Sequence, residues 1–391
     1  MGILIGVWIT QIPAVKQLDH LSDGQLGIAL FAIPLGTLAV LPVTSIVIDR
    51  VGSRRILPVA CLLAGLLLVG AGLSINLFTL FAALFLFGTS LCFLNIAMND
   101  QGIKVERRYE RSIMASFHGS YSCGALLGSA IGGFLAQAGN SPIAIFIYAG
   151  IPLGFTGLLV SRGMVSNETA LGRLPDENPN IPQSVSHRDN SPDLGIPPVY
   201  QQVPSRRKFM ILSLLALLGA LAEGAMADWA NVYLRDDLNA IPVVASAGFA
   251  VFSVSILAGR LVGDRISDRI GPKKLIRLSG MVAGLGLAGG LISHRIFGAL
   301  AGFAAMGLGL SCIVPLVMSA IGRTREDRFG ASISRITGIS TIGNLTGPVL
   351  IGGIATISGL GIALGIPAII AVATVFLAGS VAQRVLSRAP T

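Results

Sequence analysis

The sequence predicts an all-α membrane protein built from two homologous halves, and three observations support this fold class. Apolar residues make up 53% of the 391 residues and charged residues only 12%, with a mean hydropathy of +0.77, whereas soluble domains carry about 25% charged residues. The chain also contains many apolar segments of about 20 residues, the length that crosses a bilayer as a helix. Finally, the first half of the sequence recurs in the second half.

The repeat has a constant offset of 219 residues, because the string DRVGSRR at Asp49 returns as DRIGPKK at Asp268. Five glycines recur at the same offset: Gly88, Gly119, Gly124, Gly128 and Gly133 return as Gly307, Gly338, Gly343, Gly347 and Gly352. Glycine accounts for 49 of the 391 residues, so five matches at an offset already fixed by the charged motif are not expected by chance. A duplicated, glycine-rich helix bundle is typical of secondary transporters.

The apolar segments predict twelve membrane-spanning helices, six in each half. Eleven of them have the length of a span: 24–48, 56–75, 77–99, 113–138, 142–161, 208–233, 242–264, 275–293, 296–322, 330–356 and 359–382. The remaining segment, residues 1–15, is shorter than its counterpart in the second half. We therefore expect helix 1 to be truncated at its N-terminus.

The predicted domains are a six-helix half over residues 1–161, a linker over 162–206 and a second six-helix half over 207–391. The linker is rich in Pro, Asn, Ser and Asp and has little to bury, which indicates a flexible cytoplasmic segment. We expect the two halves to be related by a pseudo-two-fold axis.

The distribution of basic residues predicts the orientation in the membrane. Of the 28 Lys and Arg, only Lys16, Arg235 and Arg295 fall on one side of the predicted helices, while Arg260 and Arg335 lie within or at the ends of spans. All the others gather on the opposite side, which by the positive-inside rule is the cytoplasm. We therefore expect a multi-pass protein of a bacterial inner membrane with both termini cytoplasmic. The net charge of +9 follows from these loops and does not indicate a nucleic-acid partner.

Two predicted cytoplasmic hairpins carry the pattern Asp-Arg-x-Gly followed by basic residues. The residues concerned are Asp49, Arg50, Gly52, Arg54, Asp268, Arg269, Gly271 and Lys273. Glycine permits a tight turn, and the basic residues lie at the lipid headgroups. The pattern resembles the signature loop of the major facilitator superfamily, which stands between helices 2 and 3 and again between helices 8 and 9. The resemblance implies the twelve-helix major facilitator fold and a conformational latch. The alternative is that the motif only determines topology.

Polar side chains inside the predicted helix 7 are candidates for function, because ionisable groups at membrane depth are costly. Glu223 lies well inside this helix, and we expect it to line a cavity and bind substrate or a proton; the alternative is a structural carboxylate. Asp228 points about 140° away from it, so the two carboxylates are not expected to share a cavity unless the helix breaks at Gly224. Asn231 is predicted on nearly the face of Glu223, and Trp229 is a further candidate for substrate binding.

Further candidates lie on the predicted helices 4, 5 and 11 and share a polar side chain inside a span: Asn95, Asn99, His118, Tyr121, Thr341 and Asn344. Asn95 and Asn99 are four residues apart, so both point the same way. Their amides suit a polar solute, and the alternative is a hydrogen bond between helices. His118 is a candidate for a proton relay or for a gate.

Three segments, MNDQGIKVERR, FHGSYSCGALLGSA and AEGAMADW, resemble the YbjJ-type inner-membrane proteins of bacteria. The resemblance covers most of the chain and implies a transporter. Related motifs carry Glu where this chain has Gln101, which places any proton-carrying role of that position in doubt. Helix 4 lacks the Arg of proton-driven drug exporters, which counts against that subgroup.

The leading hypothesis is a secondary active transporter that moves a small polar solute by alternating access, with a proton as the candidate coupling ion. Two alternatives are the efflux of drugs or hydrophobic metabolites, and a non-transporting membrane sensor with the same fold. The sequence contains no phosphate-binding loop and no cluster of metal ligands, so we expect neither an enzyme nor a cofactor or metal. We expect a monomer that binds a small-molecule substrate within the lipid bilayer.

Overall fold

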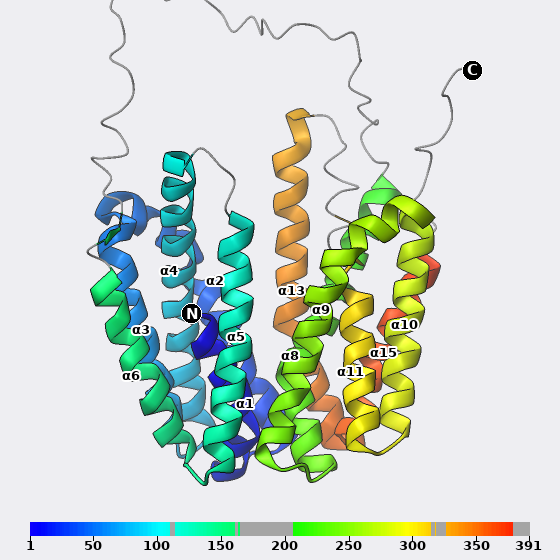
Figure 1. Ribbon diagram of the computed structural model, residues 1–391, viewed down its shortest axis with the longest axis horizontal. Coiled ribbons are helices and arrows are strands. Elements are labelled where there is room, and N and C mark those ends of the chain that lie inside the picture. Colours follow the sequence, from blue (N-terminus) through cyan, green and yellow to red (C-terminus); the bar gives the residue numbers. More distant parts are fainter. Residues whose placement is uncertain (110–113, 161–162, 165–205, 314–316, 318–325, 378–391) are drawn as a thin grey trace, which may run out of the picture.

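The computed structural model describes residues 1–109, 114–160, 163–164, 206–313, 317 and 326–377, and the regular structure within these ranges is helical (Figure 1). The first half contains α1 (Gly2–Leu18), α2 (Asp23–Val51), α3 (Ser53–Gly72), α4 (Leu77–Tyr109), α5 (Met114–Gln137) and α6 (Pro142–Val160). The second half contains α8 (Arg206–Val232), the π-helix η2 (Tyr233–Asp237), α9 (Pro242–Ile270), α10 (Pro272–Ile292), α11 (Ile296–Leu310), α13 (Glu326–Ser358), α14 (Leu360–Ala363) and α15 (Gly365–Leu377).

The helices form two groups that stand side by side and correspond to the two halves of the sequence (Figure 1). Within the described ranges, nine helices are long and apolar enough to cross a membrane, and α1 and α11 are shorter apolar helices. The N-terminus lies at about mid-height of the bundle, and α1 has 17 residues where its counterpart α8 has 27. This arrangement confirms a multi-pass membrane protein of two repeated helical halves.

Equivalent glycines make equivalent helix contacts in the two halves. A Cβ atom on Gly88 of α4 would lie 2.0 Å from the carbonyl oxygen of Ile33 on α2, and one on Gly307 of α11 would lie 2.5 Å from that of Phe252 on α9. Ile33 and Phe252 are themselves related by the 219-residue offset. The repeat predicted from the sequence is therefore also a repeat of backbone contacts, which small residues permit in membranes.

The two Asp-Arg-x-Gly motifs form the same turn in both halves, and it is tighter than the expected hairpin. Gly52 alone separates α2 from α3, with φ 88° and ψ 137°, and Gly271 alone separates α9 from α10, with φ 81° and ψ 152°. Side chains other than glycine rarely adopt such positive φ angles, so glycine is required at both turns. Asp49 and Asp268 therefore stand in the last turn of a helix.

Three helix boundaries differ from the sequence prediction for local reasons. The expected span over 77–99 continues as helix to Tyr109, because Gln101 and Lys104 both donate to the Ser53 hydroxyl, at 2.8 and 3.1 Å, and hold this extension against α3. Helix 7 ends in the π-helix η2. The last span is interrupted at Leu364, where Pro367 cannot donate to the carbonyl of the preceding turn. The predicted linker falls almost entirely outside the described residues.

We expect Gly88→Ala to destabilise the protein by roughly 1–3 kcal/mol, because the added methyl group meets the backbone of α2 and forces the helices apart. Thermal unfolding of the purified protein in detergent measures this effect. Gly70→Ala is the matched control, since Gly70 is also helical and an added Cβ there meets nothing within 4 Å. An equal loss of stability in both variants would contradict the assigned contact.

Candidate functional site

Polar contacts between the two halves, among the described residues, gather at the end of the bundle opposite the Asp-Arg-x-Gly motifs; we call this the closed end. The donors and acceptors are Lys16 and Gln17 with Asp236, Gly24 with Thr356, Ser129 with the Ser246 carbonyl, and Asn231 with the Ile9 carbonyl. Small residues complete this seam, since a Cβ on Gly352 of α13 would lie 2.5 Å from the Asp23 carbonyl oxygen. The halves are thus sealed together at the closed end.

Asn231 satisfies a carbonyl group that a proline leaves without a partner. Pro13 lies inside α1 and has no N–H, so the Ile9 carbonyl loses its usual helical donor four residues on. The fully buried Asn231 donates to that carbonyl at 3.2 Å, and its own side-chain oxygen accepts from the Phe249 N–H at 2.9 Å. This candidate residue therefore bridges the two halves and does not face an open cavity in this conformation.

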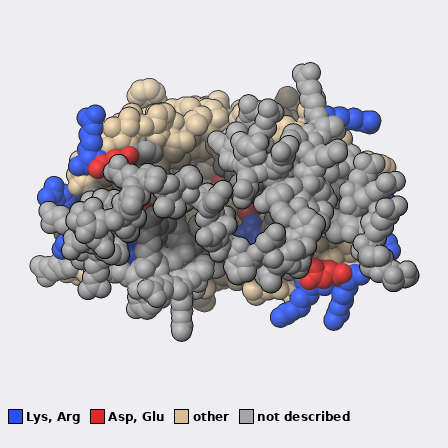
Figure 2. Space-filling model, turned by 90° about the horizontal axis from the view of Figure 1, so that it is seen from above, with Lys and Arg blue, Asp and Glu red and all other residues tan. Residues whose placement is uncertain are grey.

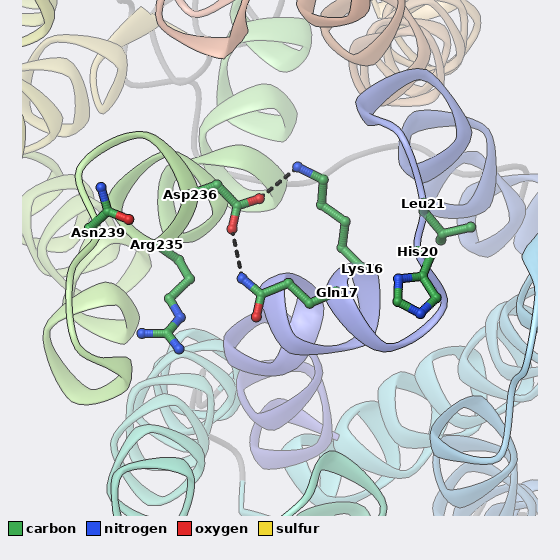
Figure 3. Close-up of a pocket in the computed structure, with 7 residues that line it drawn as sticks. All are labelled: Lys16, Gln17, His20, Leu21, Arg235, Asp236 and Asn239. Atoms are coloured by element: carbon green, nitrogen blue, oxygen red, sulfur yellow. Dashed lines mark hydrogen bonds and ion pairs between the residues drawn. The ribbon is translucent and has the colours of Figure 1, made fainter.

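A cluster of charges closes the surface of the same end. The Lys16 ammonium lies 2.6 Å from a carboxylate oxygen of Asp236 in the other half and 2.6 Å from one of Asp23. Gln17 donates to the second oxygen of Asp236 at 3.1 Å (Figure 3). These side chains border a pocket of about 450 Å³ lined by Lys16, Gln17, His20, Leu21, Arg235, Asp236 and Asn239. The π-helix η2 carries Asp236 into this position.

A stripe of half-buried residues on α8 faces the space between the halves. Between Gly219 and Leu234 the half-buried positions of α8 are Glu223, Gly224, Ala227 and Asp228, and all others are buried. Asn231 continues this stripe by one turn and contacts the first half there. Asn231 contacts the first half, so the half-buried stripe next to it on α8 is turned toward the first half as well. At the stripe itself, no hydrogen bond or ion pair links described residues of the two halves. We call the space beside the stripe the gap.

Glu223 forms an ion pair with Arg260 of α9 at the edge of this stripe. A guanidinium nitrogen of Arg260 lies 3.7 Å from a Glu223 carboxylate oxygen, and the side chains are 48% and 40% exposed. Both residues lie within apolar spans. Charges with this exposure, at a depth where burial in lipid is costly, are stable only if they reach water. Both charged side chains are thus partly exposed at a depth where contact with lipid would be costly.

Glu223 and Asp228 lie on one unbroken helix, because α8 is continuous through Gly224. The two carboxylates are thus about 140° apart, as expected, and border opposite edges of the half-buried stripe. The residues between them on that face, Gly224 and Ala227, are small and leave the face broad. Asn344 of α13 reaches this region as well, because a Cβ on Gly224 would lie 3.2 Å from its side-chain oxygen.

The other candidates are distributed over both halves. Trp229 is fully buried and packs against Gly352. Asn99 donates to Asn95 at 2.7 Å, so these two share a face of α4, in the half opposite Glu223. Tyr121 is exposed on α5. Thr341 is half-buried on α13, and the side chain of His118 lies outside the described residues.

The residues of the two Asp-Arg-x-Gly motifs lie at the end opposite the closed end. Asp49, Arg50, Arg54, Asp268 and Arg269 are exposed there, and Lys273 is half-buried. Figure 2 shows basic side chains, with acidic ones beside them, near both outer edges of this face. No ion pair between described residues involves them, so a latch formed by these motifs is not engaged among the described residues.

Sequence reasoning missed two features of the site, although each leaves a signal. Arg260 was noted only as a basic residue within a span, yet a charge there requires a partner such as Glu223. The contact of Asn231 with Ile9 is signalled by Pro13, four residues after Ile9. The closed-end ion pair between Lys16 and Asp236 has no signal in the sequence, because it depends on how the halves meet.

Two repeated six-helix halves, sealed at one end and bearing charged side chains between them, define a multi-pass membrane transporter. The chain belongs to the Major Facilitator Superfamily, whose family model matches residues 2–240 and 212–389. It is 30% identical over 381 residues to the membrane protein MosC of Rhizobium meliloti, covering 96% of this chain and 87% of that protein. It is 28% identical over 378 residues to an uncharacterised MFS-type transporter of Yersinia pestis, covering 94% and 90%.

Among solved structures, the nucleoside transporter NupG has the same fold, with a TM-score of 0.72 and 14% identity over 97% of this chain and 95% of that one. The family assignment and the fold together make this chain a transporter of a small-molecule substrate and not an enzyme.

We expect Asn231→Leu to destabilise the protein by roughly 1–3 kcal/mol, because it leaves the Ile9 carbonyl buried without a donor. Adding Pro13→Ala restores an N–H four residues after Ile9, so the double variant recovers part of the loss. Thermal unfolding in detergent of the unaltered protein, the two single variants and the double variant gives the four values of this double-mutant cycle. Strictly additive effects of the two substitutions would show that Asn231 and Pro13 are not linked through Ile9.

Proposed function

We propose that this chain is a secondary active transporter that moves a small polar solute by alternating access, with protons as the coupling ion. The observation that supports this best is the partly exposed pair of Glu223 and Arg260, together with polar contacts between the halves that, among the described residues, gather at one end. A solute that reaches this pair from the open end cannot leave through the closed end. Transport then requires the seal to move to the other end, which is the definition of alternating access.

The proposed orientation follows from the basic residues. The end with the Asp-Arg-x-Gly motifs faces the cytoplasm of a bacterium, with both termini on that side, so the structure corresponds to an inward-open state. Residues 1–161 and 207–391 move as two units, connected by the cytoplasmic linker 162–206. The two motifs form a latch when the cytoplasmic ends approach each other in the opposite state.

A polar cargo is supported by the side chains that face the gap. The stripe on α8 offers Glu223 and Asp228, and Asn344 lies beside it on α13. These groups donate and accept hydrogen bonds, which hydrophobic drugs cannot use. The likeness to NupG shows the fold alone, so its nucleoside cargo is not transferred to this chain. The site lies within one chain, which supports a functional monomer.

Proton coupling is proposed at Glu223, a carboxylate in a hydrated gap within an apolar span. We expect Glu223→Gln to retain substrate exchange across vesicles but to lose accumulation driven by a pH gradient, because the amide cannot carry a proton. Counterflow and gradient-driven uptake in the same proteoliposomes separate these two activities. Accumulation equal to that of the unaltered protein would refute the role of Glu223.

Alternating access predicts that the closed-end ion pair controls the conformational equilibrium. We expect Asp236→Asn to increase the population open at the closed end, because it removes the charge that holds Lys16 across the halves. Spin labels at Leu18 and Ile241, both exposed at this end, report longer distances in electron paramagnetic resonance of a cysteine-free background.

Asp237→Asn is the matched control for this experiment. Asp237 is the neighbouring carboxylate, but it accepts from the Gly361 N–H within the second half and not across the seam. Its replacement should leave the distance distribution unchanged. Identical distributions for Asp236→Asn and the unaltered protein would show that the ion pair does not hold the seam.

A further inference from the structure

We infer that the cargo carries an anionic group, a carboxylate or a phosphate, which the Arg260 guanidinium binds in place of the Glu223 carboxylate. This inference rests on the proposed transport function and specifies the chemistry of its substrate. It depends on three features of the gap: the loose contact of Arg260 with Glu223, the unused donors of Arg260, and the position of the other charged groups.

The contact between Arg260 and Glu223 is too long for a hydrogen bond. The closest nitrogen and oxygen are 3.7 Å apart, whereas charged N–H···O bonds are about 2.7–2.9 Å long. The two charges attract each other across partly hydrated space and do not interlock. A ligand that offers a closer contact can therefore displace the carboxylate at small cost.

Arg260 has donors available for such a ligand. A guanidinium carries five N–H groups in a planar fork and has no acceptor. Among the described residues its one close polar contact is the long one with Glu223. An arginine inside a span is costly, and a carboxylate or phosphate can satisfy its fork with two parallel bonds, which a single hydroxyl group cannot.

The surrounding charges favour an anion at Arg260 and hydrogen-bond donors farther away. Asp228 lies at the opposite edge of the α8 stripe, about 140° around the helix, where it can accept from hydroxyl or ammonium groups. Asn344 of α13 lies beside Gly224 and is neutral. The side chains of Asp264 and Arg335 lie outside the described residues. The cargo that fits is a small molecule with an anionic group at one end and donor groups at the other.

This exchange also links the anion to the proton. While Glu223 is ionised, it competes with the cargo for Arg260; once Glu223 takes a proton from the water phase, Arg260 is released to the cargo anion. Binding of one therefore favours binding of the other, as linkage requires. One proton and one negative charge enter the gap together, so the charge of the site is the same before and after binding.

Protection of Arg260 from phenylglyoxal, an arginine reagent, tests this inference without requiring transport. The purified protein in detergent is labelled in the presence of matched compounds: gluconate and glucose, alanine and alaninamide, glycerol phosphate and glycerol. Mass spectrometry of the peptide that contains Arg260 gives the rate of modification. Arg277 is the internal control, because it is exposed on α10 away from the gap.

We expect at least one anion, present at about ten times its Kd, to slow the modification of Arg260 by about tenfold through occupancy of the site, while its uncharged partner and the rate at Arg277 remain unaffected. Glu223→Gln should speed the modification of Arg260 in the absence of ligand and strengthen the protection by the same anion, because the competing carboxylate is gone. Thermal unfolding of Glu223→Gln verifies that this variant is folded. Glu223→Asp, which keeps the charge on a shorter side chain, is a second variant in which the contact with Arg260 is changed.

The inference is overturned if no anion of the panel protects Arg260, if neutral partners protect it equally, or if both Glu223 variants leave its modification rate unchanged. Failure of the proposed transport function has a different signature. In that case a protecting anion binds at Arg260, but proteoliposomes accumulate none of it under a pH gradient.

Discussion

Close contact between helix backbones, possible only where side chains are small, is the constraint on which this structure depends. Lipid is as apolar as the helix surfaces, so the hydrophobic effect does not drive helices together inside a membrane. Their association relies on close packing, as where Gly88 meets the backbone of α2 and Gly307 meets that of α9. Since these contacts recur at one offset, the helices of each half pack together by the same means.

The seam between the halves combines close contacts of small residues with a few polar contacts. The polar contacts across this seam among the described residues are few. A typical intramolecular hydrogen bond contributes only about 1 kcal/mol to the stability of a folded state. Under the proposed alternating access, the bonds of Lys16 with Asp236 and of Asn231 with Ile9 would exchange for bonds to water as the seam opens. A difference of a few kcal/mol between two states is what a population shift requires.

The sequence predicted the fold well because the fold depends on local sequence patterns and on a repeat that can be read directly from the residues. Apolar length gave the spans, and the glycines at 52 and 271 gave the turns, although the structure reduces each hairpin to a single residue. The candidate residues were only partly identifiable from the sequence. Glu223 stands out as a charge within a span, but its partner on α9 is one of several basic residues in the sequence and is identified only by three-dimensional proximity.

Contacts across the seam were beyond sequence reasoning for a related reason. They join segments more than 200 residues apart, such as Lys16 with Asp236, and depend on the angle between the halves in one of their states. The η2 π-helix that presents Asp236 is likewise invisible in the apolar pattern, because its residues would suit an ordinary helix end. The periodicity of apolar residues predicts which face of a helix is apolar. It does not predict which other helix packs against that face.

The places where the two halves differ indicate where function resides. The repeat that relates Gly88 to Gly307 also relates Glu223 to Leu4 and Arg260 to Leu41. The first half thus has leucines where the second half has a charged pair. A scaffold duplicated for packing needs no charge at these positions, and a charge within a span is retained only at a cost. The departure from the repeat at Glu223 and Arg260 is therefore consistent with the ligand site proposed there.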